Sequence, residues 1–342
     1  MKKATIIGID LAKNVFHLHG AAADGSVLFR KKLTRPQLLQ FMAEQPRCIV
    51  AMEACGGSHF WAREMTRIGH EARLIAPIYV KPFVKRQKND AADAEAIVEA
   101  ALRPTMRFVT VKSEDQQARA VLFRAREQVV NQRTEMVNAL RAHLGEFGHI
   151  APQGINNLRR LEEIIEDADT SLPDLARDIC RDMLTQISQF SARLAAMAKQ
   201  IDALSKHGAI TRRLRTMPGV GPICAMAVET FAPHMESFRR GRDFAAWLGL
   251  VPRQNSTGGK QRLGRTSKMG QRDIRRLLII GAMAIVRWAL RKGAVAGSWL
   301  ARMLAEKRRA VVAIALANKM ARGIWAMMTK QEEYRGPAMI AA

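Results

Sequence analysis

The chain has 342 residues, of which 48% are hydrophobic, and 55 Lys and Arg against 31 Asp and Glu give a formal net charge of +24. This length and apolar content indicate a folded globular protein of two or three domains and exclude a disordered chain. Such an excess of positive charge is typical of proteins with a polyanionic partner, in most cases a nucleic acid.

Membrane, disulfide and zinc-finger classes are not supported by the sequence. The longest uncharged apolar run, 277–286, stops at Arg287 and predicts a buried helix, and the N-terminus lacks the hydrophobic region of a signal peptide. Cys48, Cys55, Cys180 and Cys224 have neither CxxC spacing nor histidines at zinc-finger distance. We therefore expect a cytoplasmic protein with reduced thiols and no membrane partner.

The first part of the chain, residues 1–112, predicts an α/β domain. Strands are expected over 4–10, 15–20, 27–32, 48–53 and 72–76. One helix is expected to begin at Pro36, and another to cover about 59–68. The Asp24-Gly25 step favours a hairpin turn between the second and third strands. Strands that alternate with helices after an initial meander indicate a mixed sheet covered by helices.

Two of these strands end in a carboxylate, Asp10 and Glu53. A buried ionised carboxylate is costly unless it is paired or bound to a metal. Asp90 and Asp93, three residues apart, lie on one face of the first turn of a helix that Asn89 can cap. Two magnesium ions about 4 Å apart need several hard oxygen ligands from different elements. The four acids therefore predict a metal site, although each alone also fits a turn or helix N-terminal role.

Basic side chains flank this acidic set. The stretch just before the acidic helix holds Lys85, Arg86 and Lys88, and Lys13 follows the first strand. We expect these four residues to hold a nucleic-acid backbone close to the carboxylates.

The middle of the chain, residues 113–208, predicts a helical arm. Ser113-Glu114-Asp115-Gln116 resembles a capping box, and apolar periodicity continues from it to about residue 147. A turn region around 148–157 follows, and a second long helix is expected over about 172–206. Two long helices joined by a shorter linker predict an antiparallel coiled coil that serves in dimerisation.

The last part, residues 209–342, predicts a mainly α domain. A tight turn between two helices is expected at Pro218-Gly219-Val220-Gly221-Pro222. It is either an ordinary turn or a hairpin of the helix-hairpin-helix kind, whose backbone amides bind phosphate. Further helices are expected over 244–250, 277–290 and 310–328.

A polar, basic loop interrupts these helices, and its segment 255–260 holds one serine hydroxyl near two glycines. Between Arg253 and Arg276 there are eight basic residues and one acid, Asp273. Ser256 precedes Thr257 and two glycines, so the backbone can approach a phosphate while basic side chains stabilise a pentacovalent phosphorus. A serine hydroxyl needs a base or a metal to act as a nucleophile, and its other role is a simple hydrogen bond to phosphate. The side chains expected to contact nucleic acid are Arg253, Lys260, Arg262, Arg265, Lys268 and Arg272.

Several separated motifs resemble the DEDD transposases of bacterial insertion-sequence family 110/1111. The motifs are Gly8-Ile9-Asp10-Leu11-Ala12-Lys13, Met52-Glu53-Ala54-Cys55-Gly56, Asn89-Asp90-Ala91-Ala92-Asp93-Ala94, the Pro218–Pro222 turn, Gly249–Lys260 and Gly264–Gly270. They span both ends of the chain, which makes the resemblance specific, whereas the middle helices match in character only.

The resemblance implies a fold, a site and partners. It implies an N-terminal RuvC-like domain of the ribonuclease-H type, whose acidic tetrad corresponds to Asp10, Glu53, Asp90 and Asp93, and a C-terminal domain with an essential serine. It also implies similarity to Piv-type invertases, a guide non-coding RNA encoded by the element, and a dimer-to-tetramer assembly. Many relatives carry the serine directly before the first glycine, where this chain has Thr257, so the nucleophile is Ser256 or Thr257; we favour Ser256.

We therefore expect a transposase that cleaves and rejoins DNA strands of an insertion sequence, with Mg²⁺ or Mn²⁺ at the tetrad, in the nucleoid region of a bacterial cytoplasm. Strand transfer conserves bond energy, and no GxxxxGK[ST] motif for ATP is present. The alternatives are a metal-dependent DNA-junction nuclease that uses water, and a non-enzymatic basic scaffold for nucleic acid.

Overall fold

The computed structural model describes residues 4–85 and 90–336, and the chain divides into two compact units, 1–115 and 116–342. The boundary that the sequence predicts inside the second unit, between residues 208 and 209, stays a prediction.

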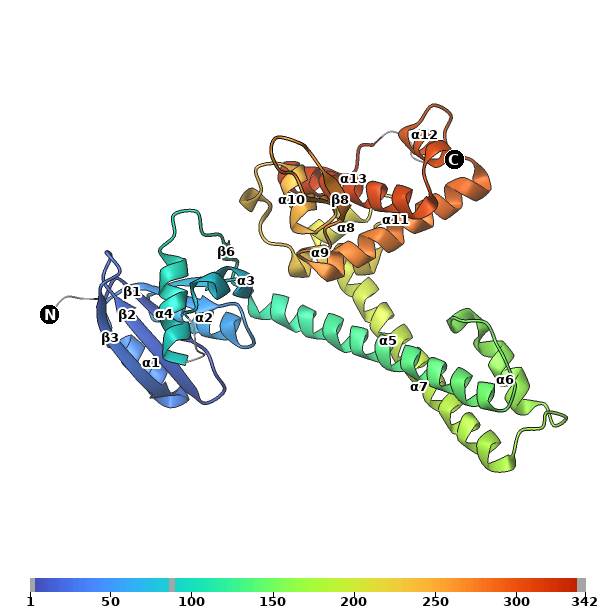
Figure 1. Ribbon diagram of the computed structural model, residues 1–342. Helices are drawn as coiled ribbons and strands as arrows, with labels where there is room; N and C mark the ends of the chain where they lie inside the picture. Colours follow the sequence, from blue (N-terminus) through green and yellow to red (C-terminus); the bar gives the residue numbers. More distant parts are fainter. Residues whose placement is uncertain (1–3, 86–89, 337–342) are drawn as a thin grey trace. The chain divides into compact units, whose positions relative to one another are not determined.

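A six-stranded mixed sheet forms the first unit, which confirms the predicted α/β class (Figure 1). Its strands are β1 (Ile6–Asp10), β2 (Val15–Ala21), β3 (Val27–Thr34), β4 (Ile49–Glu53), β5 (Glu71–Ile75) and β6 (Phe108–Val109), in the order β3-β2-β1-β4-β5-β6. Strands β1, β4 and β5 are parallel, whereas β2, β3 and β6 run antiparallel to their neighbours. The short strand β6 was not predicted.

Helices cover both faces of this sheet. On one face lie α1 (Arg35–Ala43) and α2 (Ser58–Arg67), and on the other lie α3 (Pro77–Val80), the 3₁₀ turn η1 (Lys81–Phe83) and α4 (Asp90–Ala101). Alternate residues of β1 point to the two faces: Ile7 and Ile9 pack in the cluster of α1 and α2, and Ile6 packs in the cluster of α4. The period of two in β1 therefore decides which residues reach α4.

The glycine in β1 allows α4 to lie directly on the strand. A Cβ added at Gly8 would come within 2.5 Å of the Ala94 carbonyl oxygen and 2.6 Å of Val98 Cγ2. Any larger residue would push α4 away from the sheet. The close approach brings the first turn of α4 over the end of β1.

The second unit is largely helical, and its long helices are present as predicted. Helices α5 (Glu114–Glu146) and α7 (Asp174–His207) share one apolar cluster with α6 (Leu158–Glu166) (Figure 1). Helix α6, which follows the 3₁₀ turn η2 (Ile155–Asn157), was not predicted. Because Leu161 and Ile165 of α6 are buried against both long helices, this region is a three-helix cluster. A regular coiled coil stays a prediction.

The rest of the second unit packs around three apolar helices. Its elements are α8 (Ala209–Leu214), α9 (Pro222–Phe231), η3 (Met235–Ser237), α10 (Gly241–Trp247), β7 (Pro252–Gln254), β8 (Leu263–Thr266), α11 (Arg272–Lys292), α12 (Trp299–Glu306) and α13 (Arg309–Lys330). A single core joins α9, α11 and α13. By length and composition α13 could cross a membrane, yet its apolar residues help to form this core. Helix α12 was not predicted.

The tight turn before α9 is fixed by packing on α11. A Cβ added at Gly281 of α11 would lie 2.0 Å from the Gly219 carbonyl oxygen, so the two backbones touch there. Gly219 also has a φ of +80°, which favours glycine. Packing therefore accounts for Gly219, and a phosphate-gripping role of this turn stays a prediction.

Candidate functional site

Asp10 and Glu53 lie side by side at one edge of the sheet. They end the adjacent parallel strands β1 and β4, whose register pairs Ile9 with Met52 immediately before them. Ile9 and Met52 belong to the cluster of α1 and α2, so the next residues in both strands face α4. On the other side of β1, the register places His17 of β2 opposite Asp10. Three neighbouring strands thus put a polar residue at this edge.

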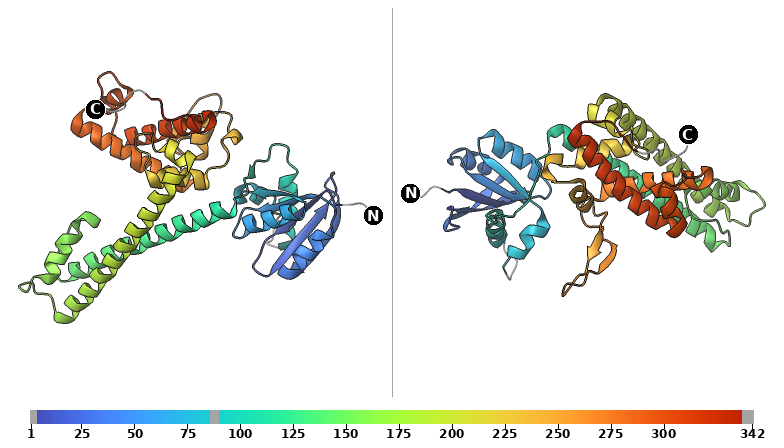
Figure 2. Two further views of the ribbon diagram at one scale, coloured as in Figure 1. Left: turned by 180° about the vertical axis from the view of Figure 1, so that it is seen from behind. Right: turned by 90° about the horizontal axis from the view of Figure 1, so that it is seen from above.

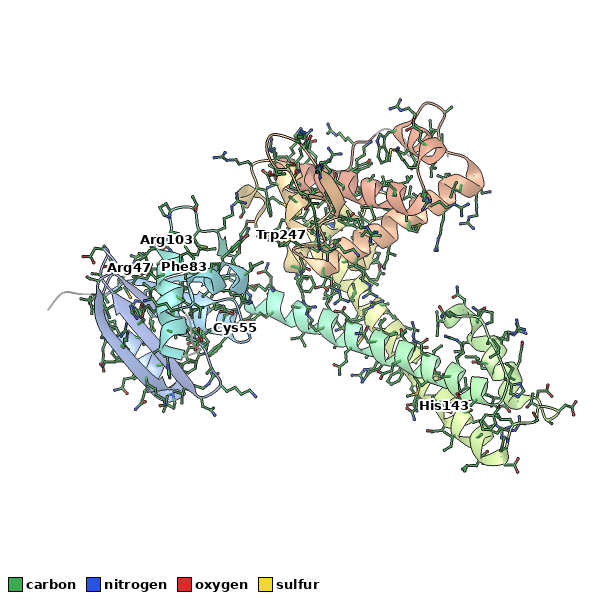
Figure 3. All side chains as sticks on the ribbon, viewed as in Figure 1. Arg47, Cys55, Phe83, Arg103, His143 and Trp247 are labelled. Carbon is green, nitrogen blue, oxygen red and sulfur yellow. The ribbon has the colours of Figure 1, made fainter. Side chains whose placement is uncertain are left out.

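Asp93 joins this edge from the first turn of α4. Its neighbour Ala94 contacts Gly8 of β1, two residues before Asp10. Burial and, after it, the negative charge of Asp93 raise the pKa of Glu53. Burial and the charges of Glu53 and Asp10 raise the pKa of Cys55, just beyond β4 (Figure 3). Glu53 therefore interacts electrostatically with Asp93, and Asp10 and Glu53 both act on Cys55. A metal site shared by these acids stays a prediction.

The fourth predicted acid, Asp90, opens α4, and its side chain lies outside the described residues. Among the side chains that the structure describes, no three His, Cys, Asp or Glu are gathered closely enough to hold a metal ion. The donor set nevertheless fits Mg²⁺ or Mn²⁺ in chemistry, because it consists of carboxylate oxygens, and two of its members, Glu53 and Asp93, repel each other. A divalent cation would relieve that repulsion.

Replacing Glu53 by glutamine is expected to raise the melting temperature of the metal-free protein at neutral pH. The pKa of Glu53 is higher in the folded protein than in the unfolded chain. Such a carboxyl stabilises the folded state when the pH is below its unfolded pKa, and this stabilisation is lost as the pH rises through its folded pKa. Ionised Glu53 is therefore destabilising at neutral pH, and the advantage of Glu53→Gln should shrink toward about pH 4. Thermal unfolding in EDTA across this pH range measures it, with Glu71→Gln on β5 as control. A lower melting temperature for Glu53→Gln at neutral pH would contradict the expectation.

The structure describes two of the four basic residues that were predicted near this edge, Lys13 and Lys85. Lys13 is exposed after β1, and Lys85 is exposed but forms an ion pair with Glu95 of α4. Glu95 also accepts a 2.9 Å hydrogen bond from Arg30 of β3, so it holds two cations beside the acidic helix turn. Neither Glu95 nor Arg30 was predicted; the position of Glu95, two residues after Asp93, indicates a place beside the acidic turn but not its cationic partners. Arg86 and Lys88 lie outside the described residues.

The serine segment, which the sequence analysis took for a loop, is a β-hairpin in the second unit; for 252–266 the loop prediction is wrong. Strands β7 and β8 pair antiparallel, and Thr257 bridges to Lys260 around a two-residue turn. The turn residues Gly258 and Gly259 have φ values of +54° and +74°, the backbone that a tight hairpin of this kind requires. Two glycines make that turn possible.

The Ser256 hydroxyl is held across this hairpin. It accepts a 3.1 Å hydrogen bond from the backbone N–H of Arg262, and it donates a 3.3 Å hydrogen bond to the side-chain oxygen of Gln254. The side chain is exposed, so the oxygen is oriented and accessible. Thr257 is also exposed, at the bridge next to the turn.

The base of the hairpin is clamped between α10 and α11. A Cβ at Gly270 would lie 1.9 Å from the Trp247 carbonyl oxygen, and one at Gly249 would lie 2.1 Å from that of Met269. Lys268 between them has a φ of +55°, which is uncommon for a residue other than glycine. Two crossing backbone segments thus fix the base while the tip projects from the helices (Figure 2).

The six basic residues predicted around the serine are all exposed, and none forms an ion pair with any residue in the described ranges. They are Arg253, Lys260, Arg262, Arg265, Lys268 and Arg272. Cations without protein partners on a projecting hairpin are suited to a polyanion.

Comparisons with known proteins match both units. Residues 7–148 match the family model of DEDD transposases of the IS110 type, and residues 211–295 match the model described as the transposase IS116/IS110/IS902 family. A probable family 20 transposase of Pseudomonas aeruginosa is 46% identical over 331 residues, which cover 96% of this chain and 98% of that protein. The transposase for insertion sequence element IS1328 of Yersinia enterocolitica is 42% identical, with 96% and 98% covered. The transposase for IS1111A of Coxiella burnetii is 35% identical, with 98% and 92% covered.

Proposed function

The chain belongs to the IS116/IS110/IS902 family of transposases, and we propose that it cleaves and rejoins DNA strands by means of a metal-binding acidic site and a serine nucleophile. The observation that carries this proposal is that Asp10 and Glu53 end adjacent parallel strands, and that the charge of Asp93, after burial, raises the pKa of Glu53. Carboxylates from neighbouring strand ends and a helix turn are typical of divalent-cation sites that act on phosphodiesters.

Asp10, Glu53, Asp90 and Asp93 would hold the cation or cations in this proposal. A bound Mg²⁺ or Mn²⁺ would supply charge stabilisation at the phosphate and would lower the pKa of a coordinated hydroxyl. The first turn of α4 adds the positive end of its helix dipole at the same edge, which favours the ionised carboxylates. The sheet order and the strand-end acids support the ribonuclease-H-like fold that the resemblance implies.

Ser256 would be the nucleophile on DNA. Its Oγ would form a bond to the phosphorus as the bond from phosphorus to one sugar oxygen breaks, and the hydroxyl proton would pass to that leaving oxygen through a base or water. The resulting phosphoserine would retain the energy of the phosphodiester, so rejoining would need no ATP. The hydrogen bond from Arg262 N–H to Ser256 Oγ orients the oxygen, and the exposed cations of the hairpin would hold the phosphate.

The remaining expectations become part of this proposal. A guide non-coding RNA and a second DNA segment are partners that the net charge of +24 can accommodate. The long helices α5 and α7 would serve in assembly to a dimer or tetramer, as a coiled-coil arm does.

The proposal is tested with the purified full chain, a radiolabelled DNA carrying the element's ends, and the non-coding RNA transcribed from the element. We expect nicked DNA and a denaturation-resistant protein–DNA adduct in Mg²⁺, and neither product in EDTA. Peptide mapping of the adduct should place the phosphate on residues 252–266. Cleavage without any adduct would contradict the serine mechanism and favour the water-using nuclease.

A further inference from the structure

The inner face of α5 in the second unit is polar in its middle. Residues spaced by three and four along the helix form one stripe, namely Arg126, Val129, Arg133, Val137, Leu140 and Leu144. The last three pack with α6 and α7, and Phe123 at the other end packs against the core of α9, α11 and α13. Two arginines therefore occupy the part of the stripe that lies between two apolar clusters.

Arg126 has no partner among the described residues. Its Nε atom is buried and makes no hydrogen bond, and no carboxylate of the described chain forms an ion pair with it. A buried donor without an acceptor costs free energy that a structural arginine would ordinarily avoid. Tyrosine or leucine would fill the same stripe at lower cost.

Two charged neighbours of Arg126, namely Arg133 and Arg276, are also cations. Arg133 of α5 donates a 3.3 Å hydrogen bond to Ser191 of α7, and Arg276 of α11 lies 3.6 Å from a carboxylate oxygen of Glu127. Burial, followed by the charges of Arg276 and Arg133, lowers the pKa of Arg126. Glu127 also pairs with Arg124, so its single negative charge is shared between two other arginines.

We propose that Arg126, Arg133 and Arg276 form a binding site for one phosphate group of a nucleic-acid backbone. Three guanidinium groups from α5 and α11, one of them with a buried unpaired N–H, match the several acceptor oxygens of a phosphate. Arg276 lies one helical turn after Arg272, where α11 leaves the serine hairpin, so the same strand can contact both places. The inference rests on the proposed function for the nucleic-acid partner, and it adds a site that the hairpin cations do not include.

If Arg126 binds phosphate, its replacement should weaken DNA binding without lowering the stability of the free protein. Replacing Arg126 by methionine removes a buried cation and the repulsion from two others, so the melting temperature of the free protein should stay equal or rise. The same variant should bind a DNA duplex of arbitrary sequence about tenfold more weakly. The slope of the logarithm of the binding constant against the logarithm of the salt concentration should fall in magnitude by about one. Fluorescence anisotropy over a salt series measures the binding. Arg159→Met on α6, whose side chain is 86% exposed and paired with Glu163, is the matched control.

Each outcome decides the proposal. A lower melting temperature of Arg126→Met together with unchanged DNA binding would overturn it, because Arg126 would then be structural. Stabilisation of the wild type by inorganic phosphate alone, with unchanged DNA affinity of the variant, would assign the site to free phosphate and overturn the nucleic-acid assignment. Arg133→Gln provides a second variant with the same expected direction. Binding needs no strand cleavage, so failure of the serine mechanism would leave these results interpretable.

Discussion

Replacing Ser256 by alanine is expected to abolish strand transfer and the covalent protein–DNA adduct, while DNA affinity and the melting temperature stay close to those of the wild type. With the described part of the chain the exposed hydroxyl makes two hydrogen bonds, to Gln254 and from Arg262, so its loss should change stability by less than about 1 kcal/mol. Loss of the nucleophile itself should lower the rate by about a thousandfold or more. Adduct formation on labelled DNA and recovery of rejoined product measure the two effects.

Thr257→Ala is the matched control, since Thr257 lies next to Ser256 on the same hairpin and is equally exposed. Both variants keep the glycine turn and the Thr257-to-Lys260 backbone bridge. We expect Thr257→Ala to retain adduct formation. If Thr257→Ala loses the adduct while Ser256→Ala keeps it, the nucleophile is Thr257. If both variants still cleave without an adduct, water is the nucleophile and the nuclease alternative is correct.

The acidic edge of the first unit could be predicted because its signals are local. Strands that end in Asp10 and Glu53 are recognisable from their β-branched residues, and parallel strands bring their carboxyl ends to one edge of a sheet. The alternation of buried residues then decides that both acids face α4. The sequence gives no such rule for Glu95 and Arg30, because their contact depends on how α4 crosses β2 and β3.

The serine hairpin shows why a correct residue can be found in a wrongly predicted element. Gly258-Gly259 is a recognised hairpin turn, yet its flanks lack the alternating apolar residues that indicate strands. Its order comes instead from Gly249 and Gly270, whose backbones cross those of Met269 and Trp247 at the base. Such a crossing joins residues about twenty positions apart and leaves no periodic pattern.

The inner face of α5 shows a different limit. Heptad-like spacing predicts an apolar seam, and it is apolar from Val137 to Leu144. Arg126 and Arg133 fall on the same stripe, where spacing alone does not indicate whether α7, α11 or solvent will face them. The position of Arg276 follows from the packing of α11, where Arg276 lies 3.6 Å from Glu127, the residue next to Arg126.

Replacing Asp10 by asparagine is expected to lower the rate of DNA cleavage by about a thousandfold or more while leaving DNA affinity unchanged. Asparagine keeps the size of the side chain at the end of β1, but it removes one of the anionic oxygens proposed to bind the cation and one of the charges that raise the pKa of Cys55. The variant should therefore bind Mn²⁺ more weakly, which electron paramagnetic resonance of the free ion measures without any reaction. Glu71→Gln on β5 is the control that removes a carboxylate elsewhere on the sheet; Glu71 is exposed and pairs with Arg73.

The two readouts for Asp10→Asn separate the three functions considered. A transposase or nuclease that needs the acidic site loses both Mn²⁺ binding and cleavage, whereas a basic scaffold keeps its nucleic-acid affinity and shows no cleavage even in the wild type. Mn²⁺ binding that survives in Asp10→Asn with wild-type strength would show that the cation is held elsewhere, and the acidic edge would then be structural. Since Asp10 faces α4 from a strand fixed by Gly8, a change confined to this side chain tests the site and leaves the fold intact.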